Sequence, residues 1–463
     1  MARELKKTYE MDLCSGAILP KLLRFCLPLM LSSVLQLLFN AADIIVVGRF
    51  AGDNSLAAVG SNSSIINLMV NLFMGLSIGA NILAARFFGA KEQEALRQTV
   101  HTAILMSLIG GVMIAVIGFF GAETILRLVQ SPESVRGLAA LYLKIYFLGM
   151  PATMLYNFGA ALLRAVGDTK RPLYYLTVAG VVNIVLNLVF VIVLRLDVAG
   201  VALATVIAQC ISAGLILRCM MRETGGVHLE LRELKIYRAR FKQILQVGLP
   251  AGLQSTLFSL SNVVIQSSIN LFGETIVAGS AAASNIEGFV YTSMNAFYQG
   301  TISFTSQNYG AGRYDRLRPI LYRALGCGTV TGVVFGGLTV IFAPVLVGIY
   351  SDSAAVIAAG VDRVRIVCLL YCLCGIMEVL VGALRGIGYS VMPMIVSLIG
   401  ACGFRILWIA TVFQIPELHQ VTTVYWSYPV SWLLTDIAHL LCYIWAFRRL
   451  RRHHMAEMEP VKP

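Results

Sequence analysis

Long apolar stretches alternate with short polar connections along the whole chain of 463 residues. A helix that crosses a bilayer needs about 20 consecutive, mainly apolar residues. Stretches of that kind predict spans near 22–47, 57–85, 99–121, 139–163, 173–194, 198–219, 244–272, 277–307, 319–349, 364–384, 391–414 and 425–447. The pattern therefore predicts an all-α polytopic membrane protein with 12 transmembrane helices.

Lysine and arginine are unevenly divided between the two sets of alternate connections. The start of the chain, the central linker and the tail are rich in them, whereas the opposite set holds few, such as Arg363 and Arg365. Arg405 is the arginine placed within a span. Because positive residues favour the cytoplasmic side, we expect an even number of spans and both termini in the cytoplasm. We also expect the protein to lie in the plasma (inner) membrane of a bacterium.

Composition supports this class and excludes others. Hydrophobic residues make up 58% of the chain and charged residues 13%, which is about half of what soluble domains carry. The net charge of +12 lies in connections, so no nucleic-acid partner is predicted. The ten cysteines show no ligand spacing and are expected to be small buried apolar residues, with no cofactor. The start of the chain lacks a cleavage site and predicts an uncleaved cytoplasmic segment.

The second half of the sequence repeats the first. FFGA at 87–90 matches NYGA at 308–311, and ALLRAVGDTKRP at 161–172 matches GALRGIGYSVMP at 382–393, both 221 residues apart. Pro28 and Pro250 open the first and seventh spans in similar contexts. We therefore predict an N-terminal lobe (1–220), a cytoplasmic linker (221–243), a C-terminal lobe (244–449) and a basic tail (450–463). Such parallel repeats are related by a pseudo-two-fold axis along the membrane normal.

Charged side chains inside the predicted spans are costly and mark candidate functional sites. Asp43 lies in the first span, and its alternative role is a helix-end carboxylate that faces water or pairs with Arg49. Glu287 and Glu378 lie in the C-terminal half and could face a cavity that takes a cationic substrate, or be bonded within their lobe. Asp436 is expected to pair with Arg405.

Further polar and soft side chains are candidates for the wall of that cavity. Gln36, Asn40 and Asn67 make the first two spans more polar than lipid-facing helices, although such residues also join helices. Tyr291 and Met294 belong to an aromatic and methionine stripe, which could line a cavity or form core. No phosphate-binding loop, HExxH motif or supported catalytic triad is present, so we do not expect an enzyme.

In order and spacing, several segments resemble the multidrug and toxic compound extrusion (MATE) family over nearly the whole chain. They are PLMLSSVLQLLFNAADIIVVGRFAG, ARFFGAKE, LLRAVGDTKRP, NIVLNLVFVI, VAGVALATVIAQ and GALRGIG. The resemblance implies a cation-coupled antiporter that exports organic, often cationic, compounds by alternating access. It further implies protons or sodium ions as coupling ions, small organic molecules as substrates and the lipid bilayer as surroundings; we expect a monomer.

The resemblance also implies a coupling site in the N-terminal lobe. Asp43 matches the acidic residue of the first span, and Asn157, Asn183 and Thr205 match polar neighbours. Asn187 stands where some members carry a second Asp, which favours protons, although Asp43, Asn183, Asn187 and Thr205 could hold Na⁺. At the acidic positions of another branch this chain has Phe258 and Cys374.

Two other functions remain open at this point. A flippase of lipid-linked precursors or polysaccharide units would share the two-lobe design, but it would need cavity cations for a pyrophosphate. The acids within the predicted spans outnumber the arginine there, which favours cationic substrates. A passive channel would differ by flux that persists without a gradient.

Overall fold

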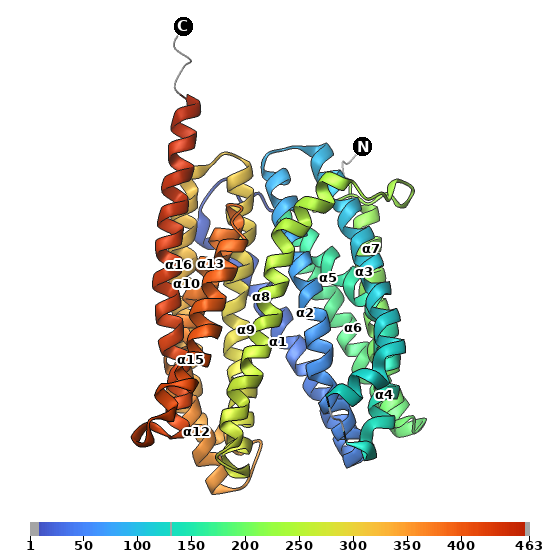
Figure 1. Cartoon of the computed structure of the whole chain (residues 1–463). Coiled ribbons are helices and arrows are strands. Elements are labelled where there is room, and N and C mark those ends of the chain that lie inside the picture. Colours follow the sequence, from blue (N-terminus) through green and yellow to red (C-terminus); the bar gives the residue numbers. More distant parts are fainter. Residues whose placement is uncertain (1–8, 130–131, 459–463) are drawn as a thin grey trace. The chain divides into compact units, whose positions relative to one another are not determined.

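The computed structural model describes residues 9–129 and 132–458, which form helices and short connections without a strand (Figure 1). The all-α prediction is confirmed. The first half contains α1 (Ile18–Phe50), α2 (Asp53–Gly89), α3 (Gln93–Leu128), α4 (Glu133–Leu148), α5 (Met150–Ala165), α6 (Lys170–Leu188) with its π-helical end η1 (Val189–Val193), and α7 (Asp197–Arg222).

The second half begins after a short 3-10 turn, η2 (Leu231–Glu233). It contains α8 (Arg238–Asn270), α9 (Glu274–Gly310), η3 (Tyr314–Arg316), α10 (Leu317–Ile341), α11 (Ala343–Gly348), α12 (Ala354–Leu369), α13 (Tyr371–Gly386), α14 (Val391–Ser397), the π-helix η4 (Leu398–Gly403), α15 (Phe404–Ala410), η5 (Val412–Gln414), η6 (Pro416–Leu418) and α16 (Val421–Met458). Each predicted span thus falls on one helix or on consecutive helical segments.

Within the described chain, eight helical segments are long and apolar enough to cross a membrane, and two bent pairs add one each. The pairs are α4 with α5, bent by 48°, and α12 with α13, bent by 44°. Pro151 at the start of α5 has no backbone N–H to continue a helix, which accounts for the first bend. α8 and α9 are 33 and 37 residues long, but serine, glutamine and asparagine make them more polar.

The backbone repeats at the offset found in the sequence. α2 and α9 each contain 37 residues and begin 221 positions apart, and α4 and α12, as well as α5 and α13, match at the same offset. Gly52 and Gly273, which precede α2 and α9, have φ values of 86° and 87°. Such positive values are accessible to glycine without strain, so the two halves share the same glycine conformation at the entry to a helix.

The chain forms two compact units, one of Met1–Leu13 and Leu27–Gly252 (unit 1) and one of Cys14–Cys26 and Leu253–Pro463 (unit 2). The helices α1 and α8 each contribute to both. Pro28 and Pro250 lie inside α1 and α8, close to these changes, rather than at the helix starts as the sequence suggested. The predicted limits of lobes, linker and tail stay predictions.

A short N-terminal segment docks on unit 1 outside the membrane helices. The N–H of Met11 donates to the carbonyl of Val166 at 3.0 Å, and Arg171 lies 4.8 Å from the centre of the Tyr9 ring. Arg171 also forms ion pairs with Asp168 and Glu223. Burial raises the pKa of Glu10, and the carboxylates of Glu223 and Asp168 add to this against the opposing charge of Arg171. The docked segment therefore carries a pH-sensitive group.

The cysteines are less uniformly buried than expected. Cys26, Cys219, Cys368, Cys374 and Cys402 are buried, but Cys210 is exposed and the remaining four are half-buried. The prediction that all ten are buried is therefore wrong for half of them. A helix face that meets lipid accepts a thiol as readily as a protein core does, because both surroundings are apolar.

Candidate functional site

Asp43 lies on α1, in the part of that helix that belongs to unit 1. Its neighbours along the helix are apolar, with Ile44 and Ile45 exposed and Val46 and Val47 buried. The carboxylate itself is half-buried. No ion pair with Arg49 or any other cation is formed by Asp43 within the described residues. The paired helix-end role considered from the sequence is therefore not what the structure has.

Neutral side chains surround the Asp43 carboxylate. The amide of Asn187 donates to Oδ1 of Asp43, and the hydroxyl of Thr205 lies 3.5 Å from Oδ2. Asn187 Nδ2 also lies 3.3 Å from Asn183 Oδ1, and Asn183 Nδ2 lies 3.4 Å from Thr205 Oγ1. The four side chains thus close a ring of hydrogen bonds, which we call the Asp43 cluster.

Helix geometry explains how the cluster forms. Asn183 and Asn187 are four residues apart on α6 and therefore share one face. α6 packs along α7, which brings Thr205 to the same level. Asn157 of α5, also predicted, is half-buried, and no hydrogen bond joins it to the cluster in the described structure. The structure thus brings together four of the five predicted residues.

The donors of the cluster bear on which cation it could bind. Asn187 turns its N–H group to Asp43, while its Oδ1 is buried without a hydrogen-bond partner in the described part of the chain. An N–H group that points at the carboxylate stabilises its charged form, and it occupies a position that a metal ion would need. The cluster contains a single carboxylate, and a sodium ion would require the Asn187 amide to turn and present its oxygen.

Two tyrosines near Asp43 were not predicted from the sequence. Tyr142 and Tyr146 lie one turn apart on α4, with their rings stacked at 5.8 Å, and the charge of Asp43 acts on both hydroxyls. Tyr142 is 7% exposed. The sequence indicated only that the two tyrosines are four residues apart and therefore share a helix face. The same spacing is common among core residues, so it did not point to a functional site.

Glu287 lies in a buried ion pair rather than free toward a cavity. Arg363 of α12 donates through Nε and Nη2 to the two carboxylate oxygens of Glu287, at 2.8 and 2.9 Å, and through Nη1 to Ser280 at 2.6 Å. The side chains of Arg363 and Glu287 are 5% and 8% exposed. The assignment of Arg363 to an outer connection is therefore wrong, because α12 carries it into the protein.

Buried arginines are also more numerous in the helices than the sequence indicated. Arg385 donates to Tyr298 and, at 2.8 Å, to Gln254, and Arg405 donates to Ser431 at 2.8 Å. Both are 3% exposed. The argument that acids outnumber a single arginine within the spans is thus corrected, but these arginines are engaged by protein groups rather than open to a phosphate.

Of the other residues predicted to line a cavity, Met294 is buried in the core, and Tyr291 is exposed. Met294 is 1% exposed and packs against Gly332 and Gly375, whose added Cβ atoms would lie 2.7 and 2.9 Å from its sulfur, so it belongs to the core. Tyr291 is 36% exposed and lies within electrostatic reach of the half-buried Glu378.

Glu378 forms no hydrogen bond or salt bridge within the described residues. Gln36 and Asn40 are exposed on α1. Asn67 lies on α2, and its side chain lies outside the described residues. Met294 is therefore a core residue, because glycines on two other helices pack against it.

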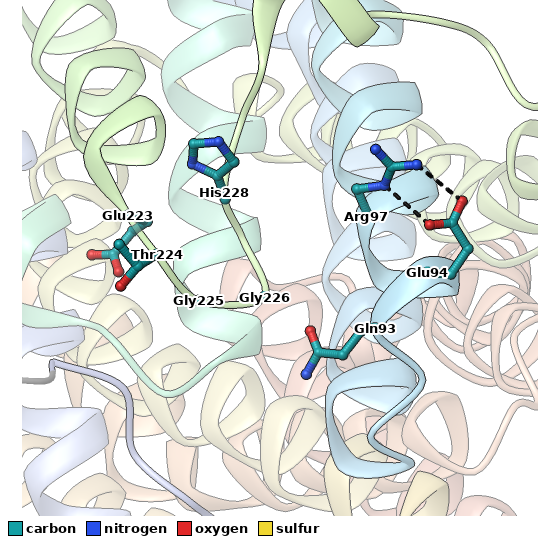
Figure 2. A pocket seen from close by; sticks show the side chains of 8 residues that line it. All are labelled: Gln93, Glu94, Arg97, Glu223, Thr224, Gly225, Gly226 and His228. Carbon is teal, nitrogen blue, oxygen red and sulfur yellow. Dashed lines mark hydrogen bonds and ion pairs between the residues drawn. The ribbon is translucent and has the colours of Figure 1, made fainter.

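A cavity of about 480 Å³ lies at one end of unit 1, between the start of α3 and the segment after α7. Figure 2 shows its lining, with Arg97 bonded to Glu94. Arg97 also pairs with Glu233. The charge of this arginine is therefore already balanced by the protein, and the cavity is separate from the Asp43 cluster. It is lined by Gln93, Glu94, Arg97, Glu223, Thr224, Gly225, Gly226 and His228.

A family model decides the relationship of this chain to known proteins. The model of the MatE family matches residues 28–189 and 250–410, one match in each half of the repeat. The chain belongs to the MatE family. The predicted membership is thereby confirmed, and the chain is a membrane transporter rather than an enzyme.

Individual MatE relatives extend over almost the whole chain. The probable multidrug resistance protein YoeA of Bacillus subtilis is 27% identical over 89% of this chain and 90% of its own length. An outward-facing multidrug resistance MATE transporter of the MOP superfamily aligns with a TM-score of 0.88 at 23% identity, over 95% of this chain and 98% of that chain.

A MOP superfamily transporter from Pyrococcus furiosus, described by the reverse polarity of its binding pocket, aligns with a TM-score of 0.87 at 24% identity, over 95% of this chain and 97% of that chain. These structural likenesses establish the fold, and the predicted twelve-helix fold in two lobes is confirmed by them.

Proposed function

We propose that this MatE protein is a proton-coupled antiporter that exports organic cations across the plasma membrane of a bacterium. The observation that carries the proposal is the Asp43 cluster. A carboxylate on a membrane helix is held there by neutral donors, Asn187 and Thr205, without a cationic partner in the described chain. Its charge can therefore be cancelled by a proton rather than by a fixed arginine or lysine.

Protonation of Asp43 would change what its neighbours can do. As a carboxylate, Asp43 accepts from Asn187 and Thr205; as a neutral acid, it becomes a donor and competes for acceptors such as Asn187 Oδ1, which lacks a partner among the described residues. That exchange would rearrange contacts between α1, α6 and α7. A coupling ion shifts a conformational equilibrium only through such a difference in contacts.

Protons are favoured over sodium by the residue composition of the cluster. One carboxylate and an inward N–H group offer less to a metal ion than two carboxylates would. Sodium would require Asn187 to turn, and Asn183 and Thr205 would then supply the remaining oxygens. Sodium coupling is therefore the alternative that the experiment has to separate.

A cationic substrate is supported by Glu378 and Tyr291 of unit 2. Glu378 is a half-buried carboxylate without an ion-pair partner in the described residues, and the exposed ring of Tyr291 lies near it. A carboxylate beside an aromatic ring suits an organic cation, because both attract positive charge. The relatives named as multidrug resistance proteins support the broader part of the proposal, drug export. Cytoplasmic termini and a monomeric state complete the proposal.

The test is transport of a fluorescent organic cation in proteoliposomes, with proton and sodium gradients imposed separately. We expect the wild type to respond to the proton gradient and Asp43→Asn to lose gradient-driven transport while remaining folded. Asp197→Asn is the matched control, because Asp197 is an exposed acid on α7 of the same unit. Normal transport by Asp43→Asn would refute the role of Asp43. Transport driven by sodium alone would replace the proton in the proposal, and flux without either gradient would indicate a channel.

A further inference from the structure

A second acidic group lies buried in unit 2, on α16. Asp436 and His439 are three residues apart on that helix and 7% and 0% exposed. Both carboxylate oxygens of Asp436 and Nδ1 of His439 are buried without a hydrogen-bond partner among the described residues. A buried carboxylate without donors is strongly disfavoured while it is charged. Asp436 therefore belongs in this position as a neutral acid.

The expected partner of Asp436 is engaged elsewhere. Arg405 donates to Ser431 and lies over the rings of Tyr428 and Trp432, at 4.3 and 5.6 Å from their centres. No salt bridge joins it to Asp436 in the part of the chain that the structure describes. The predicted Asp436–Arg405 pair is thus wrong, because the guanidinium of Arg405 points to aromatic rings one to two turns earlier on α16.

Among the described residues, no positive charge contacts Asp436. α16 packs against α12, α13, α14, η4, α15 and η5, the last of which carries no titratable side chain. Of the groups on α13, the thiols of Cys372 and Cys374 lie within reach of the Asp436 charge, and Arg385 acts on His439. The remaining titratable groups on these helices and on this stretch of α16 are Asp362, Arg363, Arg365, Cys368, Tyr371, Glu378, Cys402, Arg405, Cys442 and Tyr443. Arg363, Arg385 and Arg405 all have other partners.

A polar connection starts from the same turn of α16. His439 Nε2 lies 3.0 Å from the hydroxyl of Ser397, which is the last residue of α14. The π-helix η4 follows directly, and its Gly400 packs so closely that an added Cβ would lie 2.4 Å from Thr435 Oγ1. π-helical turns occur often at functional sites, because they displace backbone groups from regular bonding. The imidazole of His439 thus contacts the hydroxyl of Ser397 beside an irregular helix, and Asp436 lies three residues before His439 on α16.

We infer that Asp436 and His439 form a second proton-binding site of the transporter, in unit 2 and separate from the Asp43 cluster. Asp436 holds the proton as a neutral acid, and His439, with one nitrogen on Ser397 and the other without a partner in the described structure, is the adjacent base. This inference rests on the proposed proton coupling. It adds that each transport cycle moves one more proton than the Asp43 cluster alone can carry.

The first test measures the site without transport. In infrared spectra of the purified full-length protein, titrated with pH, we expect Asp436→Asn to lose one carbonyl band of a protonated carboxyl and His439→Gln to shift the pH midpoint of that band. Asp436→Glu should move the band without removing it, which keeps the test valid if the Asn variant folds poorly. An unchanged band in Asp436→Asn would overturn the inference. Asp352→Asn, at an exposed acid of unit 2, is the matched control.

The second test counts protons in proteoliposomes. We expect Asp436→Asn to lower the number of protons moved per substrate by about one, whereas Asp43→Asn abolishes gradient-driven transport. A lost infrared band with an unchanged proton count would make Asp436 a permanently neutral structural acid, and the inference would be wrong. If Asp43→Asn transports normally, the proposed function fails by itself, while the infrared result still decides whether Asp436 binds a proton.

Discussion

The buried pair of Glu287 and Arg363 offers a decisive test of which carboxylates are available to substrate. The guanidinium is bonded to both oxygens of Glu287 and to Ser280, and it also lies 5.6 Å from the ring centre of Tyr425. Removing one member of a buried ion pair leaves the other charge uncompensated and costs about 3–5 kcal/mol. Replacing both members with apolar residues of similar size is often neutral.

We therefore expect Glu287→Gln and Arg363→Met each to lower the stability of the protein by about 3–5 kcal/mol. The double variant Glu287→Leu/Arg363→Met should regain most of that loss, because no unpaired charge then remains. The assay is the temperature at which the detergent-solubilised protein loses its monodisperse peak. Glu274→Gln is the control on the same helix, since Glu274 is exposed in the first turn of α9.

The alternative role of Glu287 as a substrate ligand predicts a different pattern. Glu287→Gln would then keep the thermal stability of the wild type while losing transport of organic cations, and the double variant would be inactive. That result would refute the reasoning from the ion pair. A loss of stability in each single variant, together with recovery of stability and transport in the double variant, would leave Glu378 as the carboxylate available for substrate charge.

Two further predictions concern packing and pH. A Cβ at Gly111 of α3 would lie 2.5 Å from the backbone of Pro151, whereas one at Gly121 would meet nothing closer than a side-chain carbon of Ile125 at 3.6 Å. We therefore expect Gly111→Ala to lower the stability of the protein by about 1–3 kcal/mol and Gly121→Ala to lower it little, as measured by the same thermal assay. Equal melting temperatures of the two variants would contradict this. The pKa of docked Glu10 is raised above its ordinary value of 4.5. The docked segment therefore binds a proton more tightly than the released segment, and docking weakens as the pH rises from 4.5 through the raised pKa. Amide-exchange protection of Met11 should therefore fall with rising pH in the wild type and stay constant in Glu10→Gln, and a constant wild type would disprove it.

The helices were predictable from the sequence because each depends on local composition. Apolar stretches of sufficient length predicted most of the spans, although α8 and α9 are more polar. The four-residue spacing of Asn183 and Asn187 placed them on one face of α6. The family resemblance predicted that Asp43 and Thr205 lie near that face, and in the structure hydrogen bonds connect these four side chains. Local pattern and family resemblance were sufficient for this cluster.

Contacts between distant helices were not predictable in the same way. Arg363 lies 76 residues from Glu287, and α12 runs farther into the protein than its charged sequence indicated. Whether Met294 lines a cavity or fills the core depends on glycines of two other helices. The local sequence does not predict whether such a side chain is buried, because its burial depends on residues of other helices that pack against it.

The internal repeat provides a control for the Asp43 cluster. At the offset of 221 residues, Asn183 and Asn187 correspond to Phe404 and Trp408, whose rings lie 5.7 Å apart on α15. Counted from the two prolines, Asp43 corresponds to Ile265, which is 0% exposed in an apolar core. The same helical scaffold is thus built in unit 2 with apolar and aromatic side chains at these positions.

The scaffold therefore does not require the polar residues that unit 1 places there. A carboxylate, two amides and a hydroxyl on membrane helices cost free energy that the apolar counterparts avoid. Residues that the fold can do without, and that carry such a cost, are best explained by a task other than holding the helices together. In unit 2 the same reasoning sets Asp436 apart from Glu287: the latter is neutralised by Arg363, whereas Asp436 has no such partner within the described residues. The two proposed proton sites thus lie at different positions of one repeated backbone.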